Sequence, residues 1–152
     1  MWSDLHRYRR SSPLRKRLLV EALIALAIAR VAMTLLPFRR IAAWLGTPGV
    51  ETATSASADE IHIAQEIGWA VGALGRRVPW DGRCMAQALA ACVMLRRRGL
   101  EGTVSFGART SGSLGTAGFE AHAWLRLGPC IVTGGPAHLS FKSFTSFARR
   151  QP

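Results

Sequence analysis

The stretch Val78–Gly99, VPWDGRCMAQALAACVMLRRRG, carries signals for the start, body and end of one helix and places a cysteine near its start. Asp81 is a good N-cap residue, and helix-forming residues follow it without interruption. Three consecutive arginines and Gly99 mark the C-terminal end. The sequence therefore predicts Cys84 in the first turn, where free backbone N–H groups, the helix dipole and the neighbouring Arg83 stabilise a thiolate. The alternative is that Cys84 is simply a small buried apolar residue.

Composition limits the classes of protein to which the chain can belong. At 152 residues, with 49% apolar and 19% charged residues, it is long enough for one domain with its own core and is not a disordered protein. The net charge is +11, and nine of the 20 Lys and Arg residues lie within the first 40 positions. This favours an acidic partner surface, but no nucleic-acid reader motif accompanies the charge, so no nucleic-acid partner is expected. Three cysteines without a CxxC pair favour a reduced, cytoplasmic setting, and no metal-ligand spacing is present.

The first third of the chain is predicted to be a flexible basic arm, residues 1–13, followed by an apolar N-terminal helical region, residues 14–48. The longest apolar run is interrupted by Glu21 and Arg30, so it is not a clean membrane-spanning segment. A buried or partner-facing helix is favoured over weak contact of residues 14–38 with a membrane surface. Pro37 is expected to end this helix before a second, shorter one.

Residues 57–152 are predicted to form an α+β core. Ser57 and Glu60 have the spacing of a capping box and begin a helix that ends at Gly75. After the helix that contains Cys84, the pattern changes to apolar and polar alternation in three segments, which are 102–110, 120–128 and 130–135. The tight connection between the last two predicts antiparallel neighbours.

A catalytic thiolate needs a histidine from elsewhere in the fold, and His122 is the best candidate. It lies in the middle of a predicted strand between two alanines, which leaves its ring accessible. Spacing alone does not separate a Cys84–His122 pair from two unrelated structural residues. Cys92 lies inside the apolar helix and is interpreted as a buried, inert thiol, and Cys130 is interpreted in the same way.

Several motifs together resemble a known family. They are PWDGRCMAQALAACVMLRRRGL, VSFGA, AHAWLRLG and VTGG, with an upstream apolar helix that ends in LPFRR. Across 14–135 these resemble the leader peptidases of lasso peptide biosynthesis, in the transglutaminase-like branch of papain-fold cysteine proteases. The resemblance implies N-terminal helices before a core in which the nucleophile begins a helix packed on a small antiparallel sheet. It assigns Cys84 as the nucleophile and His122 as the general base, which later protonates the leaving amine.

The third catalytic group is where the sequence departs from the wider family pattern, which has an Asp on the strand after the histidine. No acidic residue follows Glu120. Thr133 or a backbone carbonyl near Gly134 is a candidate for orienting the imidazole, and Glu120 and Asp81 are the alternatives. For the oxyanion hole, the N–H of Cys84 is the first candidate donor and the indole N–H of Trp80 the second. Trp80 fits a core aromatic residue equally well.

The resemblance implies a cysteine peptidase that removes the leader from a lasso precursor peptide without a cofactor. It implies two partners, a separate leader-binding protein and a lasso cyclase, and the apolar N-terminal helix is expected to dock one of them. Two other functions stay open. One is a non-catalytic peptide-binding scaffold of the same fold, favoured by the missing acidic residue, and the other is a membrane-associated adaptor built on residues 14–38.

Overall fold

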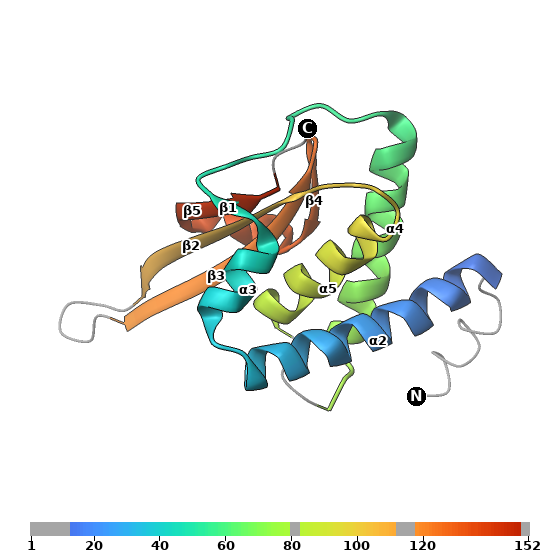
Figure 1. Ribbon diagram of the computed structural model, residues 1–152, viewed down its shortest axis with the longest axis horizontal. Coiled ribbons are helices and arrows are strands. Elements are labelled where there is room, and N and C mark those ends of the chain that lie inside the picture. The colour runs from blue at the N-terminus through green and yellow to red at the C-terminus, as the bar shows by residue number, and fades with distance from the viewer. Residues whose placement is uncertain (1–12, 80–82, 112–117, 150–152) are drawn as a thin grey trace.

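The computed structural model describes residues 13–79, 83–111 and 118–149, and it confirms the predicted α+β class. Helices and strands form two layers, with the helices gathered against one side of a single sheet (Figure 1). The helices are α2 (Pro13–Leu35), α3 (Phe38–Leu45), α4 (Ala58–Gly75), α5 (Cys84–Arg96) and the 3-10 helix η1 (Gly135–Ser140). The strands are β1 (Thr47–Pro48), β2 (Thr103–Ser111), β3 (Gly118–Leu127), β4 (Cys130–Thr133) and β5 (Lys142–Ala148).

The sheet has the order β1-β5-β2-β3-β4, and its neighbours are antiparallel. The predicted hairpin is confirmed, because β3 and β4 pair from Leu127 and Cys130 through a turn in which Gly128 has a φ of +53°. The sequence did not predict β5, which pairs with β2 on the other side from β3. The three central strands thus come from the C-terminal third of the chain.

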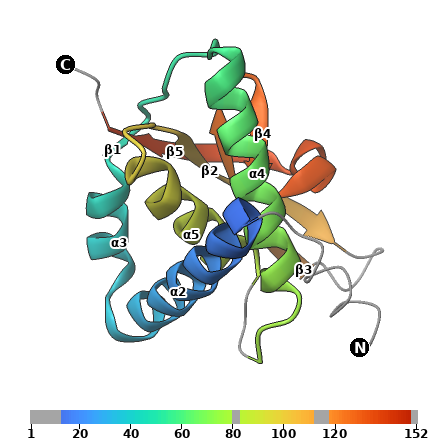
Figure 2. The ribbon, with the colours of Figure 1, turned by 90° about the vertical axis from the view of Figure 1, so that its right-hand side faces the viewer.

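Helix α5 is the centre of the hydrophobic core, and α2 and α4 pack beside it (Figure 2). The α5 residues Ala88, Ala90 and Ala91 are fully buried, and such short side chains allow neighbouring backbones to approach closely. One face of α2 enters the same core, with Ala22 and Leu26 completely buried. Residues of the predicted N-terminal region and of the predicted core therefore share one core.

The N-terminal end of α5 differs from the prediction, whereas its C-terminal end agrees with it. Its N-cap is Arg83, so the expectation that Asp81 caps the helix is wrong; Asp81 itself lies outside the described residues. At the other end, Gly99 has a φ of +72° and its N–H donates to the carbonyl of Arg96 at 3.0 Å. The N–H of Leu100 donates to the carbonyl of Leu95, which completes a Schellman motif and confirms that Gly99 marks the end of the helix.

The arginines at the end of α5 connect it to the N-terminal helices. Arg96 donates to the carbonyls of Trp44 and Leu45 at the end of α3, at 2.8 and 2.6 Å. Arg98 forms a two-point ion pair with Glu21 of α2, at 2.9 and 2.7 Å, and this hydrogen bond lowers the pKa of the Glu21 carboxyl. These contacts fix α2 and α3 relative to α5.

Judged by length and composition alone, α2 is apolar enough to cross a membrane. Its inner face is nevertheless buried against α4 and α5, and Glu21 is paired with Arg98. The outer face carries exposed apolar side chains, which are Val20, Leu23, Ile24, Ile28, Val31 and Leu35. The helix is therefore part of the core on one side and leaves an apolar stripe on the other.

Candidate active site

Cys84 is the first residue of α5, and its side chain is half-buried. The first hydrogen bond inside this helix joins the N–H of Gln87 to the carbonyl of Arg83, at 3.0 Å. The N–H groups of Cys84, Met85 and Ala86 therefore precede the intrahelical hydrogen bonds, at the positive end of the helix dipole. This confirms the predicted place of the cysteine at the helix start, where backbone donors favour an anion.

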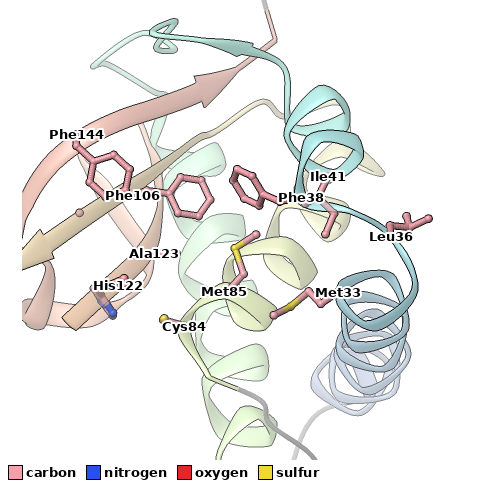
Figure 3. A pocket seen from close by; sticks show the side chains of 12 residues that line it. Met33, Leu36, Phe38, Ile41, Cys84, Met85, Phe106, His122, Ala123 and Phe144 are labelled. Atoms are coloured by element: carbon pink, nitrogen blue, oxygen red, sulfur yellow. The ribbon is translucent and has the colours of Figure 1, made fainter. Parts of the chain in front are cut away.

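His122 is brought to the same place from the middle of β3. Cys84 and His122 both line one open cavity of about 290 Å³, although 38 positions separate them in the sequence. Figure 3 shows the sulfur of Cys84 pointing toward the side of the cavity where the imidazole of His122 lies. The fold thus places together the two residues that the sequence singled out.

The imidazole of His122 is held by its surroundings on two sides. Its ring is stacked with Phe141, at a centroid distance of 4.9 Å, and with Trp124, at 6.0 Å. Its Nε2 atom lies 3.1 Å from the carbonyl oxygen of Gly134. A carbonyl oxygen only accepts hydrogen bonds, so Nε2 carries the hydrogen and the neutral ring keeps its lone pair on Nδ1. A histidine in this tautomer can accept a proton through Nδ1.

The backbone at Gly134 explains how its carbonyl reaches the histidine. Gly134 follows β4 and has a φ of +98°, which L side chains rarely adopt. A Cβ atom there would overlap the Cβ of Trp124 and would lie 3.2 Å from Nε2 of His122. Glycine is therefore needed for both the conformation and the close approach.

The other candidates for the orienting group are placed differently. The hydroxyl of Thr133 is buried and has no hydrogen-bond partner within the described residues, so the orienting partner is the carbonyl of Gly134 and not Thr133. Glu120 accepts a hydrogen bond from Arg109 at 2.7 Å and does not bond to His122. Asp81 and the proposed oxyanion donor Trp80 lie outside the described residues.

Comparison with known proteins identifies the family of the chain. The sequence profile of the transglutaminase-like superfamily matches residues 22–146, which is most of the chain. The chain belongs to the transglutaminase-like superfamily. This superfamily generally has the fold of papain-like cysteine peptidases. No curated protein and no solved structure matches the chain.

The two other cysteines differ from Cys84 in their surroundings. Cys92 is 1% exposed, and burial raises the pKa of its thiol to about 11. Burial also raises the pKa of the Cys130 thiol. The burial of Cys92 confirms its interpretation as a buried thiol. Of the three cysteines, Cys84 alone lines the cavity with His122, which makes it the candidate nucleophile of this transglutaminase-like domain.

Two parts of the site were missed by sequence reasoning. Trp124 lies two positions after His122 on β3, and alternation along a strand places such residues on the same face, so this neighbour was available from the sequence. Phe141 follows η1, a helix that the sequence analysis did not predict. No pattern in the sequence therefore indicated that Phe141 would lie beside His122. Among the described residues, no group of three or more His, Cys, Asp or Glu could bind a metal ion.

Alanine substitution at Gly134 should disturb the histidine, and Gly135 provides the matched control. Both residues have positive φ angles, so Gly134→Ala and Gly135→Ala share a strain cost of about 1 kcal/mol. Only the Gly134 variant also overlaps Trp124, which adds about 1–3 kcal/mol, because a Cβ at Gly135 meets open space. We expect a larger loss of unfolding free energy for Gly134→Ala, with changed imidazole ¹⁵N NMR shifts of His122 in this variant alone. Equal losses and unchanged shifts would contradict the assigned role of Gly134.

Proposed function

We propose that this protein is a cysteine peptidase that removes the leader from a lasso precursor peptide. The observation that carries the catalytic part is the placement of Cys84 and His122 on one cavity, with Nε2 of His122 bonded to Gly134. The transglutaminase-like domain is consistent with this chemistry, since the superfamily generally has the papain-like cysteine peptidase fold. The resemblance of the motifs around these residues to lasso leader peptidases supports the substrate class.

In the proposed mechanism, Nδ1 of His122 accepts the proton of the Cys84 thiol, and the sulfur attacks the carbonyl carbon of the scissile peptide bond. The N–H groups at the start of α5 stabilise the oxyanion that forms. The imidazolium then donates its proton to the leaving amine, which leaves the leader as a thioester on Cys84. Water, deprotonated by His122, hydrolyses the thioester and releases the leader. Throughout, the carbonyl of Gly134 accepts the Nε2–H hydrogen bond and holds the ring in place.

Two partners belong to this proposal. A separate leader-binding protein would present the precursor, and a lasso cyclase would close the ring on the new N-terminus. The basic N-terminal part of the chain would steer an acidic leader or partner surface, an effect that weakens with salt because free ions screen exposed charges. We place the reaction in the cytoplasm, where the cysteines are kept reduced.

The cleavage assay combines the protein, its leader-binding partner and a precursor peptide encoded beside it, and follows peptide masses with time. We expect wild type to release the leader and both Cys84→Ala and His122→Ala to lose at least about 10³-fold in rate, because each removes a group that takes part in bond breaking. Cys130→Ala is the matched control. The half-buried thiol of Cys130 does not line the cavity, so this variant should cut the precursor at the wild-type rate.

The outcomes separate the two parts of the proposal. Cleavage by Cys84→Ala at the wild-type rate would show that the thiol is structural. A folded wild-type protein that binds precursor and partner but does not cut would favour the non-catalytic peptide-binding scaffold. Cleavage of unrelated peptides, but not of the lasso precursor, would support the cysteine peptidase activity and exclude the lasso precursor as its substrate.

A second candidate function, attachment to an anionic membrane surface, is favoured by the outer face of α2. Val20, Ile24, Ile28, Val31 and Leu35 are each more than half exposed and follow one another at helical spacing. The helix is preceded by basic residues and followed by exposed Arg39 and Arg40. An apolar stripe between basic ends is typical of helices that lie in a lipid interface.

Flotation with lipid vesicles tests this candidate. The protein should float with vesicles that contain phosphatidylglycerol, and Ile24→Glu together with Ile28→Glu should abolish flotation, because each places a charge on the stripe. Leu139→Glu is the matched control, since Leu139 is 80% exposed but lies on η1, away from α2. Failure of wild type to float, or flotation of the double variant, would exclude attachment through α2.

A further inference from the structure

A second cavity lies beside the cavity that contains Cys84. The cavity at Cys84 has mostly apolar walls, which include Met33 and Phe38 (Figure 3). The second cavity, of about 630 Å³, is lined by residues near the end of β2, the beginning of β3, the end of η1 and the beginning of β5. Phe144 of β5 lines both cavities, so the two are adjacent and an extended peptide that crosses Phe144 reaches both.

The lining of the second cavity is basic and polar, in contrast to that of the first. Arg109 and Lys142 provide two cationic side chains, and Thr110 and Ser140 add hydroxyl groups. No acidic side chain of the described residues lines this cavity. Guanidinium, ammonium and hydroxyl groups all donate hydrogen bonds to a carboxylate. The chemistry of the lining therefore fits an anionic group.

Arg109 is held in position by two contacts. Its Nε and Nη2 atoms lie 2.7 and 2.6 Å from one oxygen of Glu120, and its guanidinium lies over the ring of Phe141, at 4.6 Å from the centroid. A guanidinium has five N–H groups, and the contact with Glu120 uses two of them. The others can donate to a ligand, and an oriented donor loses little conformational freedom on binding.

Lys142 gives the second cavity a net positive charge. Its side chain is exposed, and none of the ion pairs within the described part of the chain includes it. The pair of Arg109 with Glu120 is neutral as a whole, so it does not offset Lys142. No acidic residue follows Glu120 in the sequence, so none of the later strands and turns offsets this charge either. Charge complementarity favours an anionic occupant.

Two large apolar side chains lie beside the cations. Phe119 is 82% exposed and Phe144 is 66% exposed, and both line the second cavity. Exposed apolar side chains that gather at a concavity are typical of binding sites. An occupant that fits the whole cavity carries a carboxylate next to apolar atoms, as a Glu or Asp side chain in a peptide does.

The second cavity lies on the histidine side of the nucleophile. Figure 3 shows Phe144 and His122 on the same side of the Cys84 sulfur. Phe141, which packs against Arg109, is also stacked on His122. In the proposed mechanism His122 protonates the leaving amine. The part of the substrate that follows the cut therefore extends toward the second cavity.

We infer that the second cavity binds an acidic side chain, Glu or Asp, in the segment of the substrate peptide that follows the cut. The inference rests on the proposed function, because it takes His122 as the group that protonates the leaving amine. It adds an electrostatic requirement on the leaving segment. Lys142 and Arg109 are the residues that bind the carboxylate.

Short peptides test the cavity without cleavage. ¹⁵N-labelled protein is titrated with acetyl-Ala-Glu-Phe-amide and with its Gln and Lys analogues, and NMR shifts of the backbone amides of residues 108–110 and 142–144 report binding. At low salt we expect the Glu peptide to bind about fivefold more tightly than the Gln peptide, which is the upper range for one exposed charge pair. The Lys peptide should not shift these amides, and the preference should shrink at high salt because free ions screen the charges.

Two variants that each remove one positive charge show where the preference originates. Lys142→Gln should remove most of the preference for the Glu peptide. Arg40→Gln is the matched control, because Arg40 is also exposed but lies on α3, outside the second cavity, and it should keep the preference. Arg109 is left unchanged because it also packs against Phe141 beside His122. Thermal unfolding verifies that both variants are folded.

The cleavage assay connects the cavity with the substrate. Replacing the acidic residues that follow the cut in the precursor by their amides should lower kcat/KM about fivefold for wild type. The same replacement should change kcat/KM by less than about twofold for Lys142→Gln, because the partner of the carboxylate is already absent.

The results that would overturn the inference differ from those that overturn the proposed function. Equal binding of the Glu and Gln peptides, or an equal preference in Lys142→Gln and Arg40→Gln, would show that the cavity does not bind carboxylates, while the cysteine peptidase stands. If the Glu peptide binds at Lys142 but the amide precursor is cut as fast as the original, the cavity serves another acidic ligand, such as a partner protein, and the inference is wrong. If wild type binds the Glu peptide but cuts no precursor, the proposed function fails, and the assignment to the leaving segment fails with it.

Discussion

The hydrogen bond from Nε2 of His122 to the carbonyl of Gly134 is the interaction on which the candidate site depends. A carbonyl oxygen is not ionisable, so it accepts this bond at every pH and keeps the neutral ring in one tautomer. It gives less charge stabilisation to an imidazolium than a carboxylate would. In the proposed mechanism the sulfur of Cys84, at the start of α5, becomes the negative partner of the imidazolium, so an ion pair forms without a third acidic residue.

The geometry of that bond is produced by one hairpin. β3 carries His122 and Trp124, the turn at Gly128 returns the chain as β4, and β4 ends at Gly134. Because the base and its acceptor are on the same pair of strands, their relative positions are set by sheet register. The nucleophile is set independently by α5, which Arg96 and Arg98 tie to α3 and α2. The N-terminal helices therefore complete the core and also supply one wall of the cavity.

Local signals predicted much of this framework. The Ser57 and Glu60 capping box forms as expected, with bonds of 2.7 and 3.2 Å, and Gly99 ends the turn after α5. The strand β5 was missed because Phe144 and Phe147 in its sequence, KSFTSFA, are three positions apart, which breaks the two-residue alternation expected of a strand. The N-cap was assigned to Asp81 because Arg83 has no side chain that can accept a hydrogen bond.

The functional pairing was less accessible to sequence reasoning. Cys84 and His122 were singled out from helix position and strand context, but their shared cavity is a tertiary property. Thr133 was a reasonable orienting residue by type. Its hydroxyl is nevertheless buried without a hydrogen-bond partner among the described residues, and the carbonyl of the neighbouring Gly134 accepts the bond from His122 instead. The sequence placed Met33 and Phe38 only within an apolar N-terminal helical region. A cavity wall contains the same apolar residue types as the buried face of a helix, so the sequence did not distinguish the two.

The central claim is that His122 activates Cys84, and the rate of Cys84 alkylation by iodoacetamide at pH 7 tests it most directly. Peptide mapping separates the three thiols, and Cys92, whose pKa burial raises to about 11, is the internal control that should react only after unfolding. The account predicts that Cys84 reacts faster in the folded protein than in the unfolded chain, and that His122→Ala removes this difference. Equal rates for Cys84 in folded wild type and folded His122→Ala would contradict it.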